Sequence, residues 1–158
     1  MLYHVVDSPV GELLLRSEGE GLCGLDFLDE PFRAPTGWTH APVEFASWAL
    51  ALASYFEGGR PSFDGALVMR GTEFQKRVWN ELQRIPYGVT VSYGEIARRL
   101  GDPKAVRAVG LANGRNPIAI IVPCHRVIGA DGRLTGYGGG LHRKRALLRL
   151  EGVPVDGE

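Results

Sequence analysis

Signals for the start of a helix occur twice between residues 72 and 95. Thr72 with Gln75, and Ser92 with Glu95, have the spacing of a capping box, in which each side chain bonds the other residue's backbone N–H. Two helices are therefore predicted to begin there, each with an apolar stripe that marks its buried face. The stripes are Phe74, Val78, Trp79, Leu82 and Ile85 in the first helix, and Tyr93, Ile96, Ala97 and Leu100 in the second.

A third helix is predicted to follow almost at once in the segment LGDPKAVRAVG. Gly101 ends the second helix, Asp102 is a good N-cap and Pro103 is a good first helical residue. Helix, tight turn and helix is the spacing of a helix-turn-helix. Such units bind DNA in some proteins and only pack against other helices in others, so the spacing leaves both alternatives open.

The composition of the third helix favours contact with DNA. Val106, Val109 and Gly110 are expected to face inward and Arg107 outward, and the helix carries several small residues that give it little bulk. A slim helix with one long cation suits a narrow groove, where an inserted side chain fills the gap left by a displaced base. Arg107 is the candidate for that side chain.

The N-terminal half has a different pattern. LYHVV, ELLLRS and LCGLDF predict three short strands of a β-meander, separated by the turn signals DSPVG and EGEG. An amphipathic helix over residues 45–56 and the linker EGGRPSFDG follow. The chain is thus predicted to be α+β. It would have a small meander-plus-helix domain at residues 1–66 and a mainly helical domain at 67–158, with the helix-turn-helix and a short strand or turn.

Composition limits the class of protein. The 158 residues are 44% apolar, yet no run of eighteen apolar residues is present and no export signal begins the chain. A cytoplasmic monomer is expected. Residues 1–70 carry 4 Lys and Arg against 10 Asp and Glu, net −6, whereas residues 71–158 carry 14 against 8, net +6. A basic C-terminal half suggests an anionic partner, or a solvated surface that compensates the other half.

Cys124 lies in the segment IIVPCHRVIG, where an apolar run meets histidine and arginine. Residues 120–122 predict a short buried strand that ends at Pro123, because proline has no N–H for a sheet ladder. Two cationic neighbours are expected to favour the thiolate of Cys124 over the thiol. The segment therefore predicts a reactive cysteine, whereas Cys23, in alternation with apolar residues, is expected to be buried and inert.

Several motifs together carry a resemblance to a known family. PCHRVIG, the upstream SYGEIA and AVRAVGLANGRNP, and the downstream TGYGGGLHRKRALLRLEG occur in one order and spacing. Taken together, they resemble the O6-alkylguanine-DNA alkyltransferases over about residues 70–152. The resemblance implies direct reversal of DNA damage: the enzyme flips out an O6-alkylguanine and moves its alkyl group irreversibly to its own cysteine, once per molecule. O4-alkylthymine remains open as a second substrate.

The resemblance also implies catalytic roles for individual residues. Cys124 matches the alkyl acceptor, and His125 matches the base that takes its proton through a water. Glu151 matches the carboxylate that orients this histidine, Asn116 a brace of the active-site turn, and Tyr93 a tyrosine near the target base. Replacing Glu151 by Gln is expected to slow the reaction, because the histidine loses its carboxylate. The melting temperature is expected to stay unchanged, because Glu151 ends the last predicted helix, where its charge opposes the helix dipole.

Further residues are implied in binding. Arg107 matches the finger that replaces the flipped nucleotide in double-stranded DNA, and the expected guanine pocket uses main-chain groups near Cys124 and Val127. The remaining DNA-contact residues are Lys104, Ala105, Ala108, Gly110 and Arg115, and the remaining pocket residues are Tyr137, Gly138 and Gly139. Part of the family has a serine at the position of Gly138, which puts the contacts to O6 in doubt.

No cofactor and no metal are predicted. Some family members hold a zinc ion in the N-terminal half, and His4 and Cys23 are possible ligands, but no set of four ligands is evident. Two other classes of function remain: a non-catalytic protein that binds damaged DNA, which would lack the cysteine, and a cysteine hydrolase, which would need no Arg107.

Overall fold

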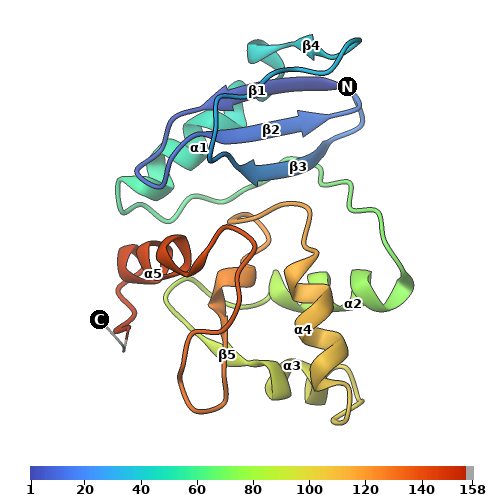
Figure 1. Ribbon diagram of the computed structural model, residues 1–158, viewed down its shortest axis with the longest axis vertical. Coiled ribbons are helices and arrows are strands. Elements are labelled where there is room, and N and C mark those ends of the chain that lie inside the picture. The colour runs from blue at the N-terminus through green and yellow to red at the C-terminus, as the bar shows by residue number, and fades with distance from the viewer. Residues whose placement is uncertain (156–158) are drawn as a thin grey trace. The chain divides into compact units, whose positions relative to one another are not determined.

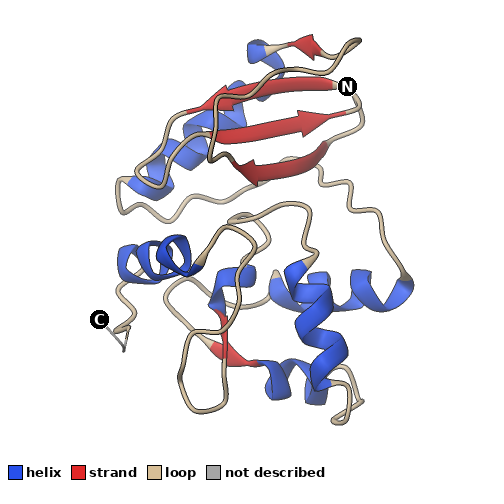
Figure 2. Ribbon diagram, viewed as in Figure 1, coloured by secondary structure: helices blue, strands red, loops and turns tan. Residues whose placement is uncertain are grey.

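The computed structural model describes residues 1–155 and divides into two compact units between Met69 and Arg70. The first unit is a twisted sheet with one helix, and the second is mainly helical (Figures 1 and 2). The predicted α+β class is confirmed. The domain boundary that we predict after residue 66 stays a prediction.

The sheet of the first unit has the strand order β3-β2-β1-β4. Strands β1 (Leu2–Val6), β2 (Leu13–Ser17) and β3 (Leu22–Phe27) are antiparallel neighbours and form the predicted meander. Strand β4 (Thr39–His40), absent from the prediction, pairs in parallel with β1. Its two residues are too few for any periodicity to reveal.

Helix α1 (Ala46–Phe56) follows the 3-10 helix η1 (Pro42–Phe45) and lies across one face of the sheet (Figure 1). Successive side chains of a strand point to opposite faces, so one set of strand residues can meet the buried stripe of the helix. The side chains buried in this unit include Leu13, Leu15, Leu22 and Leu25 from the strands and Phe45, Trp48, Leu52 and Tyr55 from the helical segment.

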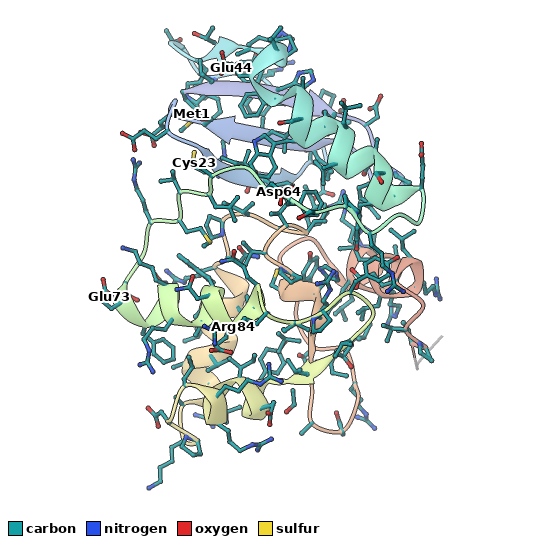
Figure 3. All side chains as sticks on the ribbon, turned by 180° about the vertical axis from the view of Figure 1, so that it is seen from behind. Met1, Cys23, Glu44, Asp64, Glu73 and Arg84 are labelled. Atoms are coloured by element: carbon teal, nitrogen blue, oxygen red, sulfur yellow. The ribbon has the colours of Figure 1, made fainter. Side chains whose placement is uncertain are left out.

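Cys23 is half-buried rather than buried as predicted, and its Sγ lies 4.0 Å from Sδ of Met1 (Figure 3). Of the side chains around it in β3, Leu22 and Leu25 are almost fully buried. The apolar alternation is thus interrupted at Cys23, in the strand where the register between β2 and β3 shifts near Arg16 and Ser17.

The second unit begins with helix α2 (Glu73–Leu82), whose first residue Glu73 is labelled in Figure 3. The capping box at Thr72 is complete: Gln75 N donates to Oγ1 of Thr72 at 3.1 Å, and Thr72 N donates to Oε1 of Gln75 at 2.9 Å. The second predicted box is half formed. Ser92 accepts from Glu95 N at 3.0 Å, but the Glu95 carboxylate instead binds Arg98 and Arg99.

Helices α3 (Tyr93–Arg99) and α4 (Val106–Gly114) form the predicted helix-turn-helix (Figure 1). The predicted start of α4 is wrong: Asp102 is not its cap. Residues 102–105 form a separate turn in which Ala105 N donates to the Asp102 carbonyl at 3.0 Å, and the N-cap of α4 is Ala105, without a side-chain bond.

A short parallel pair of strands completes the second unit, together with the last helix. Strand β5 (Val91–Ser92) pairs with β6 (Val127–Ile128), and α5 (Leu141–Leu150) follows the glycine-rich loop. The pairing connects the start of α3 to Val127 and Ile128, which lie three and four positions after the predicted reactive cysteine. Among residues 1–155 no helix is long and apolar enough to cross a membrane.

Candidate active site

A tight turn precedes Cys124, where a strand was predicted. Val122 N donates to the Ile118 carbonyl at 3.0 Å and Ile121 N to the Ala119 carbonyl at 2.8 Å, so these backbone groups bond within the turn and not in a sheet. Ile120 has φ of 71°, a left-handed conformation that is rare for a β-branched residue. The side chains of the run are nevertheless buried, as the apolar pattern predicts.

Asn116 holds this turn from both sides. Its Nδ2 donates to the Val122 carbonyl at 2.7 Å, and its Oδ1 accepts from Ile118 N at 3.0 Å. Asn113, from the buried face of α4, donates through Nδ2 to the Cys124 carbonyl at 3.4 Å. The amide side chains thus fix the backbone on both sides of the cysteine, which begins the 3-10 helix η2 (Cys124–Arg126).

Cys124 is buried, and this reverses the expected effect on its thiol. Burial raises the pKa of Cys124, because desolvation disfavours the thiolate. The polar side chains of Asn116 and Tyr137 and the charge of Lys144 favour the thiolate and oppose that rise without cancelling it. The expectation of a resting thiolate is therefore wrong: the cysteine rests as a thiol that needs a base.

His125, which directly follows Cys124, pairs with a buried carboxylate. Its Nε2 lies 2.6 Å from Oε2 of Glu151, which is 26 residues further along the chain, and both side chains are fully buried. Burial lowers the pKa of His125 although the carboxylate raises it, so the imidazole is neutral near pH 7. No group among residues 1–155 bonds its buried Nδ1. With Nε2–H donating to the carboxylate, Nδ1 is the nitrogen that can accept a proton.

Glu151 is held by more than the histidine. Its Oε1 accepts from Gly88 N at 2.9 Å and from Nε of Arg126 at 2.8 Å. Burial would raise its pKa, but the bonds from His125 and Arg126 hold the pKa of the carboxyl well below its usual range. Glu151 is thus a buried carboxylate in the ionised form, not a solvated residue at the end of α5.

A second group of side chains surrounds the expected base pocket. Tyr93 Oη accepts from Oγ1 of Thr135 at 2.8 Å, and burial raises the pKa of Tyr93. Nζ of Lys144 donates to the carbonyls of Val127 at 2.7 Å and Thr135 at 3.2 Å. It lies 5.9 Å from the ring centroid of Tyr93 and 6.0 Å from that of Tyr137. The structure therefore brings the predicted Tyr93, Val127 and Tyr137 together.

Lys144 is absent from the sequence-based prediction. Its side chain is fully buried, and burial lowers its pKa to about 8. The run HRKR suggests a solvated basic face, yet Lys144, Leu147, Leu148 and Glu151 recur at the spacing of one helix face. That spacing is the signal that places the lysine inside. The prediction also missed Asn113, Thr135 and Arg126.

The predicted glycines lie in the loop before α5. Gly138 is exposed, and a Cβ there would meet no atom of residues 1–155 within 4 Å, so the chain itself does not require glycine at this position. The Gly139 carbonyl accepts from Nη1 of Arg143 at 3.2 Å. Gly140, with φ of 91°, precedes the first residue of the helix.

The predicted DNA-contact residues lie on the outer side of the helix-turn-helix. Val109, Ala112 and Asn113 face inward from α4. Val106 is 40% exposed, so its predicted inward position is wrong, and Leu111 is 68% exposed. Four of the predicted contact residues are exposed: Lys104, Arg107, Ala108 and Arg115. The other two, Ala105 and Gly110, are half-buried.

The candidate zinc ligands do not meet. Nδ1 of His4 lies 3.0 Å from Nε2 of His40, on the neighbouring strand β4, while Cys23 contacts Met1. Within residues 1–155 no three side chains of His, Cys, Asp or Glu gather into a group that could hold a metal ion. The geometry of the second unit instead suits nucleophilic chemistry by a thiol with a histidine base and an orienting carboxylate.

Comparison with known proteins agrees with this arrangement. Residues 73–153 match the family model described as "6-O-methylguanine DNA methyltransferase, DNA binding domain", and residues 1–67 match the ribonuclease-like domain of the same methyltransferase.

Individual relatives match over nearly the whole chain. The methylated-DNA–protein-cysteine methyltransferase of Mycolicibacterium paratuberculosis is 57% identical over 150 residues, 94% of this chain and 91% of its own. The protein of the same name from Methanosarcina acetivorans is 53% identical over 96% of this chain and 99% of its own. The crystal structure of Mycobacterium tuberculosis OGT in complex with DNA superposes with a TM-score of 0.88 at 57% identity, covering 96% of this chain and 92% of that one.

The fold, the buried cysteine with its histidine and carboxylate, and these matches over both units lead to one assignment. The chain belongs to the O6-methylguanine DNA methyltransferase family, the methylated-DNA–protein-cysteine methyltransferases of DNA repair.

Proposed function

We propose that this protein reverses DNA damage by moving the alkyl group of O6-alkylguanine onto its own Cys124. The observation that carries the proposal is the 2.6 Å contact between His125 and Glu151 directly beside the cysteine turn. A buried thiol with a raised pKa needs such a base before it can act as a nucleophile.

The chemical step is a displacement at carbon. The Cys124 proton moves toward Nδ1 of His125, and the sulfur forms a bond to the alkyl carbon while the bond from that carbon to O6 breaks. The electron pair of the broken bond stays on the guanine, which takes up one proton from solvent, and the imidazolium then returns the thiol proton to solvent. A thioether is not reduced as a disulfide is, so each molecule reacts once. Glu151 stabilises the imidazolium that forms.

The remaining predicted residues would orient the base and the DNA. Asn116 braces the turn, Tyr93 and Tyr137 border the base, and the backbone at Val127, Gly138 and Gly139 lines its pocket. Arg107 would occupy the place of the flipped nucleotide, which lowers the cost of unstacking, a few kcal/mol. Lys104, Ala105, Ala108, Gly110 and Arg115 would contact the duplex around it.

Intact-mass measurement tests the proposal. The protein is mixed with a duplex oligonucleotide carrying one O6-methylguanine, and peptide mapping then locates any added group. We expect one methyl group per molecule, on Cys124, together with an unmodified guanine in the DNA. A parallel duplex with O4-methylthymine asks whether that lesion is also a substrate.

Two other outcomes would point to the alternative functions. Tight binding of the damaged duplex without methyl uptake would indicate a non-catalytic damage-binding protein. Repeated turnover of an ester or amide substrate without a stable mass gain would indicate a hydrolase. The expected cytoplasmic location and monomeric state remain predictions.

A further inference from the structure

We propose that Arg126 is a positioning residue for alkyl transfer: its guanidinium fixes the Glu151 carboxylate in the orientation that presents Oε2 to the His125 ring. The inference rests on the proposed function of Cys124, His125 and Glu151, and it assigns a role to a side chain that sequence reasoning regarded only as a cationic neighbour of the cysteine.

The contact between the two side chains uses both carboxylate oxygens. Nε of Arg126 donates to Oε1 of Glu151 at 2.8 Å, and Nη2 donates to Oε2 at 3.1 Å. Paired donors in a planar fork fix the plane of a carboxylate as well as its position, which one point charge does not do. The carboxylate is therefore held against rotation about its last side-chain bond.

The guanidinium is itself anchored. Nη1 of Arg126 donates to the Ile85 carbonyl at 2.7 Å, and the guanidinium carbon lies 5.8 Å from the ring centroid of Tyr87. Both partners belong to the segment that follows α2, and Gly88 of the same segment donates its N–H to Oε1 of Glu151. The α2–β5 connection therefore fixes the orientation of Glu151 through Arg126 and Gly88. The Nε2 bond of His125 makes no contact with that connection.

Consecutive residues converge on one carboxylate. His125 and Arg126 are neighbours in η2, and Oε2 of Glu151 accepts from both at 2.6 and 3.1 Å. If the fork is removed, the carboxylate loses the paired donors that fix its plane. The bonds just described then leave one contact on each oxygen, from Gly88 N to Oε1 and from His125 to Oε2. The carboxylate that selects the Nε2–H tautomer of His125 is then oriented less strictly.

The charge of Arg126 has a second effect, on the histidine. The charged groups that face His125 are Glu151 at the end of α5, Arg126 in its own turn and Lys144 from within α5. After burial, which lowers the pKa of His125 most, Glu151 raises it while Arg126 and Lys144 lower it. Arg126 therefore helps to keep the imidazole neutral, which is the form that can accept the thiol proton.

A purely structural ion pair would contribute to folding and leave the chemistry of a folded molecule unchanged. Orientation and charge are separated by a matched pair of variants. Arg126→Lys keeps the charge and loses the planar fork, whereas Arg126→Met keeps much of the side-chain volume and loses both. Arg84→Met is the control. Arg84, labelled in Figure 3, is an exposed arginine beyond the end of α2, and it pairs with Glu81.

The experiment measures the rate of benzyl uptake from free O6-benzylguanine across pH, by intact mass, below the melting temperature of each variant and per folded molecule. We expect Arg126→Lys to lower the plateau rate, by up to about a hundredfold if the carboxylate moves by about 1 Å. The acid limb of its pH profile should stay near the wild-type pH, because the charge is kept. We expect Arg126→Met to lower the plateau at least as much and to move the acid limb to higher pH, because the histidine then protonates more readily.

Wild-type plateau rates in folded Arg126→Lys and Arg126→Met would overturn the proposal. If Arg126→Met does not fold, Arg126→Lys decides alone: a lower plateau at normal folding supports the orienting role, and a wild-type plateau refutes it. Failure of the proposed function is distinguishable, since the wild-type protein itself would then take up no benzyl group at Cys124.

Discussion

Nε2 of His125 lies 2.6 Å from Oε2 of Glu151, and neither side chain has any solvent exposure. An ionised carboxylate at this distance fixes the ring tautomer and stabilises the imidazolium that forms when the thiol is deprotonated. Because the cysteine rests as a buried thiol, this pair would decide, under the proposed function, how readily the sulfur becomes a nucleophile.

The first prediction concerns the acceptor itself. Cys124→Ala is expected to abolish alkyl uptake and to leave affinity for duplex DNA nearly unchanged, because the predicted DNA contacts lie on the exposed side of α4. Intact mass and a binding titration measure the two effects. Cys23→Ala is the control and should react as the wild type does. Continued alkyl uptake by the Cys124→Ala protein, at Cys23, would refute the assignment.

The second prediction is that Glu151→Gln slows the reaction with free O6-benzylguanine, most at neutral pH and less toward alkaline pH, where hydroxide ionises the thiol without the base. The rate is measured against pH by benzyl uptake. An unchanged rate across the whole pH range would mean that the carboxylate plays no part in activating the thiol.

The same variant is expected to lose stability, contrary to the expectation from the sequence. That expectation rested on the position of Glu151 at the C-terminal end of a helix, where a negative charge opposes the helix dipole. In the structure, removing the charge leaves the Arg126 guanidinium without its carboxylate, at a cost of about 1 to 3 kcal/mol. The folded-state pKa of Glu151 lies below the ordinary 4.5, so its contribution is present above pH 4.5 and is lost as the pH falls below that value. Denaturant unfolding at pH 7 and pH 3 should show the difference from wild type shrinking at pH 3.

The third prediction separates base flipping from chemistry. Arg107→Ala is expected to slow repair of O6-methylguanine in duplex DNA far more than reaction with free O6-benzylguanine, because a free base needs no extrusion. Single-turnover rates with both substrates give the comparison. Arg84→Ala, outside the helix-turn-helix, is the matched control and should slow neither reaction. Equal slowing of the two reactions by Arg107→Ala would remove the role of the finger.

The fourth prediction concerns Lys144, whose charge favours the thiolate of Cys124. Burial lowers the pKa of Lys144 to about 8, so the lysine is charged below pH 8 and becomes neutral as the pH rises through that value. Lys144→Met is therefore expected to slow benzyl uptake below pH 8, with the ratio of wild-type to variant rate falling above it. Lys76→Met, exposed on α2, is the control. A ratio that is independent of pH would show that the lysine acts through packing alone.

Local signals in the sequence predict much of the fold. The strands β1 to β3 are short apolar runs bounded by turn residues, and α2 begins at a complete capping box. The start of α4 was misjudged because Asp102 followed by Pro103 also suits the tight turn that these residues form. The turn at residues 118–122 was mistaken for a strand because its side chains are buried, and apolar content does not distinguish the two.

In the candidate site, too, local sequence signals predict some features and miss others. Cys124 and His125 are adjacent in the chain, so their chemistry is visible in one segment. The bonds that orient them join residues far apart: Gly88 is 63 positions from Glu151, and Arg126 is 41 positions from Ile85. Such pairings depend on how the segments after α2 and at the end of α5 pack, which no local pattern reports. Burial of the thiol, which reverses its expected pKa shift, is likewise a property of the folded chain.

Helix α4 is only nine residues long and carries Arg107 on its exposed side and Asn113 on its buried side. The two are six positions apart, or about 9 Å along the axis. The inner side is tied at Ala112, whose carbonyl accepts from Nε1 of Trp79 at 2.8 Å, and at Asn113, which donates to the Cys124 carbonyl. The helix that would contact the duplex is therefore bonded directly to the peptide that carries the sulfur. Under the proposed function, a lesion engaged by the outer side of α4 would therefore be coupled to the thiol through the hydrogen bonds of a single helix.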